Sequence, residues 1–168
     1  MLSRIGAVVD WVALQAARLG MVMLALVAAF LFFEVAARYL FRAPTIWTQD
    51  VSITLQIWLT FLGMAYVLRR REMIRITVVT ERLGPTANRV LDIFGLLVVT
   101  GFSILAVRET TRIALESIAV GRRQPTMLEM PNWINEFGLV VGFSLLLVQA
   151  IAELVRSAIG PRDGARAR

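Results

Sequence analysis

The chain has 168 residues, of which 58% are hydrophobic, and its mean hydropathy is +0.70. A soluble domain of this length could not bury so much apolar surface, so we expect an integral membrane protein. The absence of histidine and cysteine excludes bis-imidazole haem, most zinc and copper sites, iron–sulfur clusters, disulfides and thiol nucleophiles. We interpret the formal charge of +6 as a signal of membrane topology and lipid head groups, not of nucleic-acid binding.

Long apolar segments fill most of the sequence. A bilayer core of about 30 Å takes roughly 20 helical residues per crossing, so the chain has room for about four spans and no separate soluble domain. We therefore expect an all-α membrane protein in which residues 1–168 form a single membrane domain. The predicted spans are residues 19–41, 46–68, 87–113 and 131–155.

Three shorter segments mix apolar and charged residues at helical spacing, which is typical of helices that lie on a membrane surface. The β-branched residues of the second segment leave a strand possible there. In the third, charge pairs three and four residues apart support a helix. These predicted interfacial segments are residues 2–18, 72–83 and 108–120, and a C-terminal tail covers residues 156–168.

The distribution of arginine predicts the orientation. If both termini are cytoplasmic, the cytoplasmic segments hold 12 of the 18 arginines and the outer segments hold 6. The positive-inside rule therefore favours a cytoplasmic N-terminus and a cytoplasmic C-terminus. A basic cluster after the second span is a candidate contact for phospholipid head groups. Its members are Arg69, Arg70, Arg71 and Arg75.

The second predicted span carries a stripe of small and polar residues. Gln49, Ser52, Gln56, Thr60 and Gly63 recur at spacings of 3, 4, 4 and 3 residues, which places them on one helical face. Polar groups are costly in lipid, and small residues let helices approach closely. The stripe therefore predicts a contact with another helix, either within this chain or in a partner subunit.

The last predicted span repeats this device. Gly138 and Gly142 form a GxxxG pair, and Gln149 and Glu153 follow on a similar face. A GxxxG pair indicates close helix packing, but it does not distinguish packing inside this chain from packing against a partner. Both glycines are therefore candidates for a helix-packing or subunit-interface role.

Charged and aromatic residues flank the first connection between spans. Glu34 and Arg38 stand four residues apart in the order that favours an intrahelical ion pair, and a proton or substrate relay is the alternative. Asp50 lies near the start of the second span, where a carboxylate interacts favourably with a helix N-terminus. Trp47 suits the membrane interface. We expect these four residues to anchor helix ends or to contribute to an interface.

The sequence does not support an enzyme, a cofactor or a metal site. Serine and threonine are present, but the chain lacks the histidine or lysine base that usual nucleophile constellations need. We also detect no inverted repeat, no pair of discontinuous helices and no ladder of intramembrane acids. A complete transport path within this chain is therefore not expected.

The order of these features resembles the small, Q-type membrane subunit of tripartite ATP-independent periplasmic (TRAP) transporters, from about Arg18 to Val155. Two departures are Met73, where many members of that family carry histidine, and Asp50, where glutamate is usual. The matching segments are Glu34-Val-Ala-Ala-Arg38-Tyr39, Trp47-Thr-Gln-Asp50, Phe61-Leu-Gly63-Met-Ala65, Arg69-Arg-Arg-Glu-Met-Ile-Arg75-Ile and Met130-Pro131-Asn-Trp133.

This resemblance implies a bacterial inner-membrane protein that acts as a static scaffold. Its implied partners are a large multi-span permease, which carries sodium and an organic acid by an elevator motion, and a periplasmic solute-binding protein, which delivers the substrate. Substrate choice would then rest with those subunits. Two other classes stay open: a stand-alone homo-oligomeric transporter that uses Glu34 or Asp50 as its coupling acid, and an assembly factor of another membrane complex.

Overall fold

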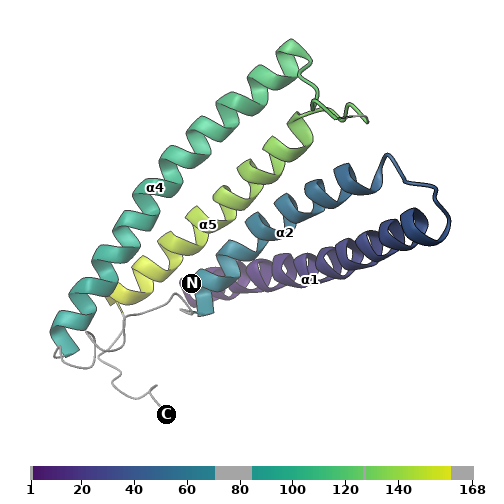
Figure 1. The fold of residues 1–168 in the computed structure, drawn as a ribbon. Coiled ribbons are helices and arrows are strands. Elements are labelled where there is room, and N and C mark those ends of the chain that lie inside the picture. Colours follow the sequence, from purple (N-terminus) through teal and green to yellow (C-terminus); the bar gives the residue numbers. More distant parts are fainter. Residues whose placement is uncertain (1, 71–84, 127, 160–168) are drawn as a thin grey trace.

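The computed structural model consists mainly of long helices (Figure 1). It describes residues 2–70, 85–126 and 128–159. The helices in these ranges are α1 (Leu2–Leu40), α2 (Thr48–Arg70), α4 (Pro85–Val120) and α5 (Trp133–Ile159). All four are long and apolar enough to cross a membrane, which confirms the predicted all-α class with four candidate spans. The predicted interfacial segment 72–83 lies outside the described residues.

Helices α1 and α4 are longer than a bilayer core is thick. With 39 and 36 residues they extend about 58 Å and about 54 Å at 1.5 Å per residue. Residues 2–18 and the first predicted span form one unbroken helix, and residues 108–120 continue α4 in the same way. Both segments are thus helical extensions of spans. Their location at a membrane surface stays a prediction.

Helix α4 ends just before Gly121, which forms its C-terminal cap. Gly121 adopts a φ of 65°, which a glycine reaches without steric cost. The Arg122 backbone N–H donates to the Ser117 carbonyl at 2.9 Å, and the Gly121 N–H donates to the Ile118 carbonyl at 3.2 Å. This pair of bonds is the Schellman arrangement that satisfies the last carbonyls of a helix. The chain then turns back into α5.

The helices form a row in the order α1, α2, α5, α4 (Figure 1). Helices α1 and α2 form one hairpin, α4 and α5 form another, and α2 packs against α5. We call the end with connections 41–47 and 121–132 the hairpin end, and the end where α1 begins and α5 finishes the terminal end. The two hairpins diverge toward the hairpin end in Figure 1.

Small residues allow the helices of the row to approach one another. On α1, Ala13, Ala16 and Gly20 are buried at spacings of three and four residues, and a Cβ on Gly20 would lie 3.5 Å from the Leu59 carbonyl oxygen of α2. This α1 seam is absent from the sequence-based predictions, although its spacing is readable there. Between α2 and α5, the apolar core centres on Leu68, Leu146 and Ala150.

Candidate partner-binding surface

The GxxxG pair of α5 lies inside the chain, against α2. A Cβ on Gly142 would lie 2.7 Å from the carbonyl oxygen of Phe61, and a Cβ on Gly138 would lie 3.1 Å from the ring of Trp58. The Trp58 indole N–H donates to the Ile134 carbonyl at 3.2 Å. Because nothing larger than hydrogen fits at Gly142, the α2–α5 contact depends on fit between the two backbones, as expected for helices in lipid.

No described helix covers the opposite face of α2. Every exposed residue of α2 lies on it, and Gly63, where a Cβ would meet nothing within 4 Å, falls in the same line. We call this face the α2 strip. Its members are Gln49, Ile53, Gln56, Thr60, Gly63, Val67 and Arg70. They recur at alternating spacings of 4 and 3 residues, which is the heptad spacing of a helix that packs along one partner helix.

The α2 strip has Ile53 in place of Ser52 of the predicted stripe, and it continues to Val67 and Arg70. Ser52 is only 2% exposed and lies on the covered side of α2, whereas Ile53 is exposed. Gln49, Gln56 and Thr60 are exposed as members of the strip. Among the described residues, a Cβ on Gly63 would meet nothing within 4 Å, so the described helices do not pack closely against that glycine. A contact of this glycine with a partner subunit stays a prediction.

The strip places amide groups where lipid would otherwise surround them. Gln56 stands within the candidate span Thr48–Arg70, and its side chain is exposed. The Thr60 hydroxyl is satisfied locally, because it donates to the Gln56 carbonyl at 2.7 Å. A side-chain amide has two donors and one acceptor, and leaving them without partners in hydrocarbon is costly. The Gln56 amide therefore favours a protein neighbour over a lipid one.

Glu34 secures the first connection at the hairpin end. Its Oε1 accepts a 2.8 Å hydrogen bond from Arg38, which is also the intrahelical ion pair predicted from the spacing. Its Oε2 accepts a 3.1 Å bond from the backbone N–H of Thr45 and a further bond from the Thr45 hydroxyl, which also contacts Thr48. Both oxygens are thus engaged in holding the chain reversal.

Trp47, in the same connection, packs against α1. Its ring lies edge-on to Phe30, with ring centroids 5.5 Å apart, and stacks on Phe33 at 6.4 Å. Both phenylalanines belong to α1, so the indole joins the α1 end to the start of α2. Trp47 is still 38% exposed, which leaves room for a membrane-interface role.

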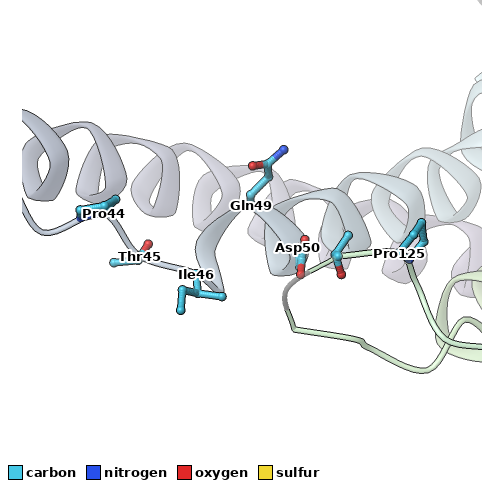
Figure 2. A pocket seen from close by; sticks show the side chains of 7 residues that line it. Pro44, Thr45, Ile46, Gln49, Asp50 and Pro125 are labelled. Carbon is cyan, nitrogen blue, oxygen red and sulfur yellow. The ribbon is translucent and has the colours of Figure 1, made fainter.

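Asp50 is a buried predicted site residue with an incomplete set of hydrogen bonds. It is 5% exposed, and its Oδ2 has no hydrogen-bond partner among the described residues. It lines a cleft of about 390 Å³ between the start of α2 and the segment around Pro125 (Figure 2). The other lining residues are Pro44, Thr45, Ile46, Gln49 and Thr126. In Figure 2 the Asp50 carboxylate points toward the Pro125 side and Gln49 points the other way.

The second connection has its own buried carboxylate. Glu136, which is 9% exposed, accepts hydrogen bonds on Oε1 from Ser117 at 2.6 Å and from Asn132 at 2.8 Å. These bonds tie the start of α5 to the end of α4. The exposed face of α4 nearby carries Arg112, whose guanidinium donates to Glu116 at 2.9 Å.

A charged network joins three helices at the terminal end. Arg156 of α5 donates to Asp10 at 3.0 Å and to Glu153 at 2.8 Å, and Gln149 donates to Asp10 at 3.3 Å. Arg69 of α2 lies 3.5 Å from the Asp10 carboxylate. Two carboxylates therefore face two guanidinium groups inside one chain. Sequence reasoning missed this network because it assigned Asp10, Arg69 and Arg156 to three separate segments.

The predicted head-group arginines are placed only in part. The Arg69 guanidinium is directed at Asp10, and it also donates to the Asp10 carbonyl at 3.2 Å. The Arg70 guanidinium donates to the Tyr66 hydroxyl at 2.8 Å and lies over that ring. Arg71 and Arg75 lie outside the described residues. Contact with phospholipids stays a prediction for all four.

Comparison with known proteins agrees with the helical arrangement. Residues 27–160 match the family model for tripartite ATP-independent periplasmic transporters, DctQ component. A protein of Haemophilus influenzae that carries the provisional name TRAP transporter small permease protein is 32% identical over 68 residues. That match covers 40% of this chain and 42% of the relative, so less than half of either protein is aligned. Because the family match extends over most of the chain, this protein belongs to the DctQ family of TRAP transporter small permease components, which are multi-pass membrane subunits and not enzymes.

Proposed function

We propose that this chain is the scaffold subunit of a sodium-coupled, binding-protein-dependent transporter for organic acids, and that it binds the large permease subunit through the α2 strip. The observation that carries the proposal is the uncovered Gln56 amide within a candidate span. Protein contact would satisfy that amide, whereas lipid would not. The heptad spacing of the strip suits a single helix of the partner laid along α2.

Several hydroxyl groups inside the spans support a scaffold and not a carrier. The hydroxyls of Thr60, Thr100, Ser103 and Ser144 each donate at 2.7 Å to the carbonyl four residues earlier. Such bonds consume the hydroxyl within its own helix. The network around Asp10 and the bonds of Glu34 lie at opposite ends of the row. We therefore assign sodium and substrate to the large subunit.

For the orientation, we propose that the terminal end is cytoplasmic and the hairpin end periplasmic. The excess of arginine in the segments assigned to the cytoplasm supports this orientation. It also directs the two connections toward the side where a periplasmic solute-binding protein docks transiently. The cytoplasmic arginines would then lie near anionic phospholipids of the bacterial inner membrane.

The experiment that tests this function is reconstitution into liposomes with an imposed sodium gradient. The chain alone is expected to move no organic acid above the background of empty liposomes. Addition of a cognate large permease, and of the binding protein loaded with substrate, is expected to give uptake that depends on sodium. Uptake by the chain alone would contradict the scaffold assignment and favour a stand-alone transporter.

A further inference from the structure

We propose that the cleft at the hairpin end receives a cationic side chain of the large permease subunit, with Asp50 as its counter-ion. This inference rests on the proposed function, because it takes the large permease as the partner. It goes further by assigning a specific site, a specific residue and the charge of the group that enters.

The Asp50 carboxylate is poorly satisfied in the isolated chain. At 5% exposure its carboxylate has little access to water, and Oδ2 has no hydrogen-bond partner in the described part of the chain. Glu34, at the same end, has bonds on both oxygens from Arg38 and Thr45. Glu136 has an Oε2 without a partner among the described residues, but its Oε1 accepts two hydrogen bonds, whereas no hydrogen bond to the Asp50 carboxylate is found in that part of the chain. A buried charge without a partner is unfavourable, so Asp50 is the carboxylate at this end that a further cation would stabilise most.

The cleft is lined by hydrogen-bond acceptors. Besides the Asp50 carboxylate, the Thr126 hydroxyl lines it, and this oxygen also lacks a hydrogen-bond partner among the described residues. Both groups accept hydrogen bonds. A guanidinium or an ammonium group brings several N–H donors together with a positive charge, so it satisfies both acceptors at once. The described arginines form no ion pair with Asp50, and Arg123 of the second connection pairs with Glu129.

The position of the cleft at the end of the α2 strip indicates which protein supplies the cation. Gln49 belongs to the α2 strip and also lines the cleft. A partner helix that follows the strip toward the hairpin end therefore arrives at the cleft. The same subunit that covers Gln56 in the membrane would place its cationic side chain near the membrane surface. This continuity favours the large permease over the soluble binding protein.

A role in the fold alone makes a different prediction for Asp50. Near the N-terminus of α2, a carboxylate interacts favourably with the helix dipole, and its removal would then destabilise the isolated subunit. If Asp50 instead awaits a cation, Asp50→Asn removes an unpaired charge. The variant then leaves the melting temperature of the isolated subunit unchanged or raises it, while it weakens the complex.

The test compares Asp50→Asn, Asp50→Glu and the control Glu129→Gln, which changes an exposed carboxylate at the same end. Each tagged variant is co-expressed with the large permease, and the bound permease is quantified in detergent at rising salt. We expect Asp50→Asn to raise the apparent Kd for the permease about tenfold or more, because one partner of a buried charge pair is lost. Asp50→Glu keeps the charge and retains more permease than Asp50→Asn. Glu129→Gln matches the unchanged chain.

A photo-reactive amino acid at Ile46, which lines the cleft and is 59% exposed, then identifies what enters. The expected product joins this chain to a peptide of the large permease that contains arginine or lysine. Equal retention by Asp50→Asn and Glu129→Gln, or a product with the binding protein alone, overturns the cleft proposal and leaves the proposed function standing. If even the unchanged chain retains no permease, it is the proposed function that fails.

Discussion

The two ends of the helix row differ in whether their carboxylates are paired with arginines of the same chain. At the terminal end, Asp10 and Glu153 face Arg69 and Arg156, so the charges are compensated within the chain. At the hairpin end, Asp50 is as buried as Glu153 and more buried than Asp10, but it has no cation among the described residues. A compensated network serves the fold of the subunit, whereas an uncompensated carboxylate beside a cleft supports the proposal that another molecule completes the site.

The two faces of α2 also differ: one is packed within the chain, and the other is exposed. One face holds Phe61 against Gly142 of α5 at backbone contact distance. The other presents Gln56 and Gly63 to the outside, and a Cβ on Gly63 would meet nothing within 4 Å. Substitutions on the first face are therefore expected to change the stability of the isolated subunit. Substitutions on the second are expected to change only its assembly.

The largest effect is expected from Gly142→Leu. Its side chain would meet the Phe61 backbone, so α5 and α2 must separate. Overpacking of this kind typically costs about 1–3 kcal/mol and occasionally more. We expect a strongly lowered melting temperature, or no folded protein, for the isolated subunit. The matched control is Gly101→Leu in α4, where the added Cβ meets nothing within 4 Å, and it should melt near the unchanged chain.

The next effect concerns the terminal network. Asp10→Asn removes the negative charge shared by Arg69 and Arg156, and we expect a loss of about 1–3 kcal/mol from the free energy of unfolding. Glu109→Gln, which changes an exposed ion pair on α4, should cost no more than about 1 kcal/mol. Thermal unfolding of the isolated subunit measures both. Equal stability of the two variants would mean that the terminal network contributes nothing specific.

A change on the α2 strip should act on assembly alone. We expect Gly63→Leu to leave the melting temperature of the isolated subunit unchanged, because the added side chain enters open space. In the complex it would separate α2 from the partner helix, since close approach depends on small residues. Co-purification of the large permease should fall. A subunit that melts much lower after this change would place Gly63 in an internal contact.

The smallest effect is expected from Gln56→Ala. Hydrogen bonds between transmembrane helices contribute only about 0.6–2 kcal/mol, so the variant should weaken permease binding without abolishing it. The change is measured as the fraction of permease retained in a detergent wash. Val67→Ala, lower on the same strip, removes no hydrogen bond and serves as the control. Equal retention by the two variants would show that the Gln56 amide has no partner.

Much of the fold was predictable from hydropathy, because lipid requires long apolar helices. The side of α2 on which each residue lies was not predictable, since it depends on where α1 and α5 sit around that helix. Ser52 and Ile53 are neighbours in sequence, yet only Ile53 is exposed.

Some members of the candidate site were predictable from local spacing, but contacts between helices were not. The spacing of Glu34 and Arg38 indicated their ion pair, because that contact is local to one helix. The contact of Arg69 with Asp10 spans 59 positions and arises only when α1 and α2 pack together. The state of Asp50 likewise depends on the cleft that two separate connections form. Such long-range geometry is not encoded in the pattern of one segment.

The central claim is that the α2 strip faces the large permease, and the absence of cysteine from the chain allows a direct test. Gln56→Cys on the strip and Val98→Cys, on the exposed surface of α4, each introduce a single reactive thiol. Each is reacted in native membranes with a short thiol-specific photo-cross-linker. The account predicts a product with the large permease from position 56 and little or none from position 98. Cross-linking from position 98 alone would contradict it.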